Sequence, residues 1–186
     1  MATAISAWAK CRKFGKATRA KAILDKMRSS YVSGIIKSPP NIYCYTAVIN
    51  ACAYVERDSM EQREALKVFL ATYKEMVNDE DVVPNNVTFS TVLTALRNLL
   101  PADHKRTDAT RRVFQKCVDL GMCNPTVTQR LQSLLNTEEL KELLGDERVD
   151  GNGAVITERL PEEWSQHVQS KAKKQYARKN RWARKL

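Results

Sequence analysis

The sequence predicts an all-α protein built from repeated helix pairs, and three observations support this fold class. Apolar side chains recur with the spacing of a single helix face, as at Tyr45, Val48, Ile49 and Cys52. Equivalent apolar positions recur along the chain after 44, 44 and 41 residues, at Ile5, Ile49, Leu93 and Leu134. Strand-like runs are scarce. Because a lone helix pair cannot bury its apolar face, this period predicts a right-handed α-solenoid of three to four helix-turn-helix repeats with a C-terminal helical extension.

The first two units differ in completeness. The first has a helix around Ile5 and a second one near Met27, but it lacks the expected opening of its first helix, so we interpret it as truncated. The second has the Tyr45 face, a polar turn, and then a helix that Ser59 can cap. Its second helix places an apolar stripe at Ala65, Leu66, Phe69, Tyr73 and Met76.

The third and fourth units follow the same order. Two further stripes lie on either side of an inter-helix loop, and Gly121 follows the second one, where a helix end favours positive φ. The fourth unit has a helix from Val127 and a short partner that Asn136 or Thr137 caps. A final helix is predicted from Leu160, with Trp164 docked on the last repeat. The predicted divisions are a truncated repeat at 1–41, full repeats at 42–85 and 86–126, and a degenerate capping repeat at 127–145. A loop with a basic helix or tail follows at 146–186.

Several segments resemble the pentatricopeptide repeat family. The run Asn-Val-Thr-Phe-Ser-Thr-Val-Leu-Thr-Ala-Leu at 86–96 resembles the first helix of that motif. The run Ala-Leu-Lys-Val-Phe-Leu at 65–70 and the closing Val-Pro-Asn at 83–85 resemble its second helix and final turn. The resemblance covers roughly residues 1–135. The units here are longer than the basic unit of the family, and the surplus falls in loops.

The resemblance implies a binder of single-stranded RNA in which each repeat contacts one base. It assigns base-edge contacts to Thr46 with Asn85, to Ser90 with Thr126, and to Asn41, whose only counterpart is Ala2. It assigns base stacking to Tyr43 and Val87, and it puts Leu131 in the polar position of the last unit. The alternative for Thr46 and Ser90 is that small residues near a helix start are caps or packing residues.

The same resemblance implies RNA processing, stability or translation in mitochondria or chloroplasts. Two complete units give modest selectivity, so protein partners or self-association are expected. One alternative is a protein-binding scaffold of the tetratricopeptide type, although its Trp/Gly/Tyr pattern is missing. A second is that the chain is a marginally folded fragment. A third is that the basic N-terminus is a mitochondrial presequence, but Ala20, Ile23 and Leu24 fall in repeat phase.

Charge and composition favour binding over catalysis. The net charge is +10, and residues 1–37 and 164–186 each carry +8, which suits a polyanionic partner. His104 and His167 lie far apart in sequence, and no glycine-rich phosphate loop or zinc spacing occurs. The five cysteines are odd in number and lack C-x-x-C spacing, so buried free thiols are predicted. We therefore expect no enzyme activity, cofactor, metal, membrane span or small-molecule substrate.

Overall fold

The structure, a computed structural model, describes residues 2–56 and 59–168. The described part contains eight α-helices: α1 (Ala2–Lys10), α2 (Lys16–Val32), α3 (Ile42–Ala53), α4 (Ser59–Asn78), α5 (Asn86–Leu99), α6 (His104–Asp119), α7 (Pro125–Gln132) and α8 (Thr137–Leu144). No strand occurs in those residues, apart from an isolated antiparallel bridge between Val149 and Val155. The predicted all-α class is confirmed. The Arg57-Asp58 part of the predicted turn and the basic segment 171–185 lie outside the described residues.

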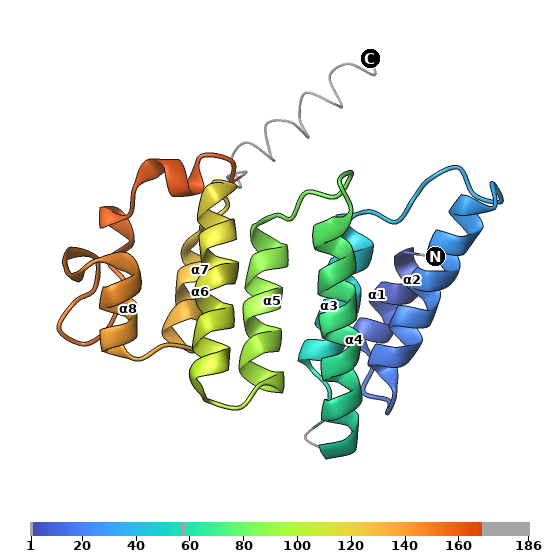
Figure 1. Cartoon of the computed structure of the whole chain (residues 1–186), viewed down its shortest axis with the longest axis horizontal. Coiled ribbons are helices and arrows are strands. Elements are labelled where there is room, and N and C mark those ends of the chain that lie inside the picture. Colours follow the sequence, from blue (N-terminus) through green and yellow to red (C-terminus); the bar gives the residue numbers. More distant parts are fainter. Residues whose placement is uncertain (1, 57–58, 169–186) are drawn as a thin grey trace, which may run out of the picture.

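The helices lie side by side along the long axis of the molecule (Figure 1). Helix α3 packs against α1 on one side and α5 on the other, and α5 packs in turn against α7. Each of these odd-numbered helices also packs against the helix that follows it in the chain, and α2 packs against α4. The odd-numbered helices therefore form one continuous row, which we call the first-helix row.

The core follows the apolar stripes predicted from the sequence. Tyr45, Ile49, Phe69 and Phe89 are fully or almost fully buried between helices. The cysteines are free thiols, and all but the half-buried Cys11 are buried, as predicted. No helix in the described residues is both long and apolar enough to cross a membrane.

The predicted helix ends at Gly121 and Asn136 are confirmed. Gly121 has φ +61°, and the amides of Gly121 and Met122 donate to carbonyls of the last turn of α6. Asn136 caps α8, because its side chain accepts from the Glu139 amide at 2.9 Å, while the Glu139 carboxylate accepts from the Asn136 amide at 2.9 Å.

Polar contacts tie the first helix pair to the second. Lys16, only 5% exposed, donates through Nζ to the carbonyl of Tyr54 at the end of α3. The Gly15 amide donates to Glu61 Oε1 at 3.0 Å. The buried Tyr45 hydroxyl donates to Asp79 Oδ2 at 2.9 Å and accepts from Arg28, which joins α2, α3 and the end of α4.

The C-terminal extension differs from the α-helix predicted to begin at Leu160. Among the described residues after Leu160, only a short 3-10 helix forms, η3 (Glu162–Ser165). Two further 3-10 helices precede it, η1 (Asp146–Arg148) and η2 (Thr157–Arg159). The ring of Trp164 packs edge-on against Phe114 of α6, with 5.7 Å between the ring centroids, so Trp164 docks on the predicted third unit and not on the last repeat. Its carbonyl accepts from the Cys123 amide at 2.7 Å, and the His167 amide donates to the Gly121 carbonyl at 3.0 Å. These backbone groups are used to dock the segment on α6, and they are no longer available to an α-helical ladder.

Candidate nucleic-acid interface

Three helices of the first-helix row begin with an asparagine cap of nearly identical geometry. Asn41, Asn85 and Asn124 have φ between −115° and −128° and ψ between 170° and 177°. Each side chain accepts from the backbone amide three residues later, at 3.3, 3.0 and 3.0 Å respectively. The caps therefore define a common register for α3, α5 and α7.

Exposed side chains recur two residues after each cap. Tyr43 is 72% exposed and Val87 is 53% exposed, and they occupy the same register of successive helices. In α7 the equivalent residue is Thr126, which is also exposed. The two residues assigned to base stacking thus lie where a flat ring could reach them.

Polar residues recur five positions after each cap. Thr46 and Ser90 are both half-buried at this position. The Thr46 hydroxyl lies 2.9 Å from the Thr88 hydroxyl of the neighbouring helix. The Ser90 hydroxyl donates to the carbonyls of Asn86 and Val87, at 3.0 and 3.1 Å. Each hydroxyl therefore has a partner within the protein, although it keeps lone pairs that could accept from a base.

The structure changes the register of the last repeat. Asn124, rather than Thr126, is equivalent to Asn85, because both residues cap the next helix of the row. Gln129, rather than Leu131, lies five residues after its cap, and it is exposed, whereas Leu131 is fully buried. The predicted spacing of 41 residues from Leu93 to Leu134 also pairs Pro84 with Pro125, but Pro84 precedes its cap while Pro125 follows it as the first helical residue. The sequence carries a signal for this register, because an asparagine lies five residues before Thr46 and five residues before Ser90. The same spacing would have identified Asn124 and Gln129.

Acidic residues are segregated between the two sets of helices. Helices α1, α3, α5 and α7 contain no aspartate or glutamate, and their charged residues are Lys10, Arg97 and Arg130. The acidic residues of the eight helices all lie on α2, α4, α6 and α8: Asp25, Glu61, Glu64, Glu75, Asp108, Asp119, Glu138, Glu139 and Glu142. The first-helix row therefore carries only positive side-chain charge, whereas the opposite row carries charges of both signs.

The buried thiols are poorly suited to act as nucleophiles. Burial raises the pKa of Cys52 to about 12 and that of Cys123 to about 11, so the thiols stay protonated at neutral pH. Within residues 2–56 and 59–168, no group of three or more histidine, cysteine, aspartate or glutamate side chains is placed to hold a metal ion.

Comparison with known proteins found no matching family model, no matching curated protein and no matching solved structure.

Proposed function

We propose that this protein binds single-stranded RNA along its first-helix row. The observation that carries the proposal is the complete absence of carboxylates from α1, α3, α5 and α7, combined with a repeated register of exposed and polar side chains. Phosphates are attracted to basic side chains and repelled by carboxylates, and unpaired bases stack on flat side chains and bond to polar ones. The resemblance to pentatricopeptide repeats supports the same function.

We also infer that the helix pairs stack as a right-handed α-solenoid of three to four repeats. The order of contacts along the first-helix row supports this arrangement, because each pair packs against the next pair in the chain. In this proposal Tyr43 and Val87 stack on bases. The base edges are contacted by Thr46, by Ser90, and by the amides of Asn41, Asn85 and Asn124. The inferred role is in RNA processing, stability or translation, in a mitochondrion or chloroplast.

Electrostatic attraction should be moderate and measurable. Three basic residues lie on the first-helix row. If all three contact phosphates, the logarithm of the binding constant should fall with the logarithm of salt concentration with a slope of about −2. Each good base contact adds about 1–3 kcal/mol. A few contacts of this size give weak binding, so a partner protein or a second copy of the chain would be needed for high selectivity.

The test is a titration of labelled single-stranded and duplex RNA, followed by fluorescence anisotropy over a salt series. Asn85→Ser keeps an N-cap acceptor but removes the amide, and Thr46→Val keeps the side-chain shape but removes the hydroxyl. Tyr43→Ala removes a stacking ring. Tyr31→Ala is its matched control, because Tyr31 is an exposed tyrosine of α2, outside the first-helix row.

We expect binding to single strands that weakens about 5-fold or more for Asn85→Ser and Tyr43→Ala, with little change for Tyr31→Ala. Equal affinity for all four variants would refute base contact along this row. No binding to single strands at low salt would refute the function as a whole.

A second candidate is a scaffold that binds a protein segment. An apolar cleft of about 200 Å³ lies between the end of α4, the start of α5 and α6, lined by residues that include Met76, Val82, Val92 and Leu120. Exposed Val77 and Val83 extend its apolar lining. If the protein is a scaffold, Val83→Ser should lower its affinity for the partner and Asn85→Ser should leave that affinity unchanged. If it binds RNA, Asn85→Ser should lower the affinity for RNA and Val83→Ser should leave it unchanged.

A further inference from the structure

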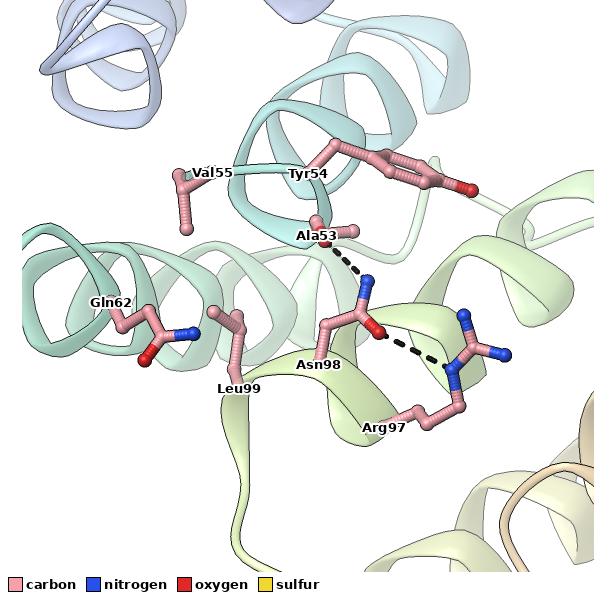
Figure 2. A pocket seen from close by; sticks show the side chains of 7 residues that line it. All are labelled: Ala53, Tyr54, Val55, Gln62, Arg97, Asn98 and Leu99. Carbon is pink, nitrogen blue, oxygen red and sulfur yellow. Dashed lines mark hydrogen bonds between the residues drawn. The ribbon is translucent and has the colours of Figure 1, made fainter. Parts of the chain in front are cut away.

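A polar cleft lies at the opposite end of α3 and α5 from the asparagine caps. Its volume is about 620 Å³, within the range of roughly 300–1,000 Å³ that small-ligand sites occupy. It is lined by the end of α3, the first turns of α4 and the end of α5, and Figure 2 shows its side chains. Helix α3 has 12 residues, so the cleft lies about 17 Å from the Asn41 cap and is a separate site.

Asn98 links the ends of α3 and α5 beside the cleft. Its Nδ2 donates to the carbonyl of Ala53 at 2.7 Å, and its Oδ1 accepts from Arg97 Nε at 3.2 Å (Figure 2). A guanidinium has five N–H donors in a planar fork, and only the Nε–H is used in this contact. In the part of the chain that the structure describes, Arg97 has no other hydrogen bond or ion pair. Its terminal N–H groups therefore have no hydrogen-bond partner among the described residues.

The carbonyl groups at the end of α3 are already occupied. Ala53 accepts from Asn98, and Tyr54 accepts from the buried ammonium of Lys16. The polar groups left in the cleft are mainly donors: the Arg97 fork, the second N–H of Asn98 and the carboxamide of Gln62, which is directed toward Leu99 and Asn98 in Figure 2. Among the described residues that line the cleft, none is acidic. Such a donor-rich cleft suits an anion with hydrogen-bond acceptors.

Tyr54 adds a flat surface to this set of donors. Its side chain is half exposed and borders the cleft, on the same side as Arg97 in Figure 2. A cationic fork, two carboxamides and an aromatic ring complement the parts of a nucleotide, which are a phosphate, base-edge acceptors and a ring face.

We propose that this cleft binds a phosphorylated nucleotide, with the phosphate on Arg97 and the base against Tyr54. The inference rests on the proposed RNA binding for its natural ligand, because the strand would supply the nucleotide at this second contact. The same chemistry could also bind a free mononucleotide. The two sources differ in whether the nucleotide is part of a chain, so they can be separated.

The experiment uses the whole protein, with adenosine monophosphate in one arm and a single-stranded oligoribonucleotide in the other. NMR spectra of the side-chain amides report on Asn98 and Gln62 directly. Arg97→Gln removes the fork, and Arg97→Lys keeps the charge without the fork geometry. Arg112→Gln is the matched control, since Arg112 is an exposed arginine of α6 outside the first-helix row. Thermal unfolding of each variant shows whether its fold is retained.

We expect both ligands to shift the Asn98 amide signals, and Arg97→Gln to weaken binding about tenfold while Arg112→Gln leaves it within about twofold. Arg97→Gln should also reduce the salt slope for RNA by about 0.7. Shifts with the mononucleotide alone would keep the site and assign it to a free nucleotide. RNA binding that leaves Asn98 unshifted and is insensitive to Arg97→Gln would overturn this inference but not the proposed function. Absence of binding in both arms would overturn both.

Discussion

Tyr45→Phe is the substitution whose effect on stability follows most directly from the structure. Tyr45 is fully buried, its hydroxyl donates to Asp79 at 2.9 Å, and it accepts from Arg28. Phenylalanine keeps the ring and its packing, so the change removes two hydrogen bonds to charged groups and little else. Such bonds contribute about 1.5–3 kcal/mol each when shielded. Arg28 and Asp79 are half exposed, and water can replace part of what they lose.

We therefore expect Tyr45→Phe to lower the free energy of unfolding by about 2 kcal/mol in total. For a chain of this size, the corresponding fall in Tm is about 4–8 °C. Urea unfolding followed by far-ultraviolet circular dichroism measures the change, and the slope m should stay constant because the buried surface does not change. Tyr43→Phe is the control, since the Tyr43 side chain is 72% exposed. If the two variants unfolded at the same urea concentration, the Arg28–Tyr45–Asp79 contacts would contribute nothing and the reasoning would be wrong.

Three further predictions concern the loop glycine, the thiols and alkaline pH. Gly121→Ala should cost about 1–2 kcal/mol, because φ is +61° and the new Cβ would lie 2.8 Å from Gln166; the emission spectrum of Trp164 should change with it. A thiol reagent at pH 8 should modify the half-buried Cys11 first, while Cys52 and the other buried thiols react only at the rate of unfolding; fast reaction of more than one thiol would contradict this. Burial raises the pKa of Tyr45, so the folded state holds a proton that the unfolded state loses near pH 10. Stability should therefore fall as pH rises above about 10, and less steeply in Tyr45→Phe.

The helices could be predicted from sequence because their signals are local. The stripe around Tyr45 and the glycine at 121 depend only on residues within a few turns, and both are present in the structure. The cap of α8 was predicted to be Asn136 or Thr137, and the structure shows Asn136, which forms a capping box with Glu139 three residues later.

The register of the last repeat could not be predicted from its proline. Proline is tolerated both before an N-cap and as the first helical residue, so Pro84 and Pro125 mark positions that differ by two residues relative to their helices. Asparagine at the cap is the more reliable marker, because its side chain satisfies a free amide of the first turn. Aligning Asn85 with Asn124 would have placed Gln129 in the candidate site.

The polar cleft has no signal in the sequence. Tyr54 and Arg97 lie 43 residues apart, and they meet only because α3 and α5 pack together and end at the same level. The α-helix predicted for the C-terminal extension was wrong for a related reason. Its local sequence favours a helix start at Pro161. The amide of Cys123, which is distant in sequence, instead donates a hydrogen bond to the Trp164 carbonyl.

The hydrogen bonds that cross from one helix pair to the next have a consequence for how the protein melts. Three hydrogen bonds link neighbouring helix pairs at their edges. Lys16 donates to the Tyr54 carbonyl, Asn98 to the Ala53 carbonyl, and Thr107 to Glu139. If one helix pair unfolded, a polar group of the adjacent pair would lose its hydrogen-bond partner, and the adjacent pair would become less stable. Heating should accordingly collapse the array in a single concerted step, with calorimetric and van't Hoff enthalpies in agreement, and fraying from one end should be suppressed.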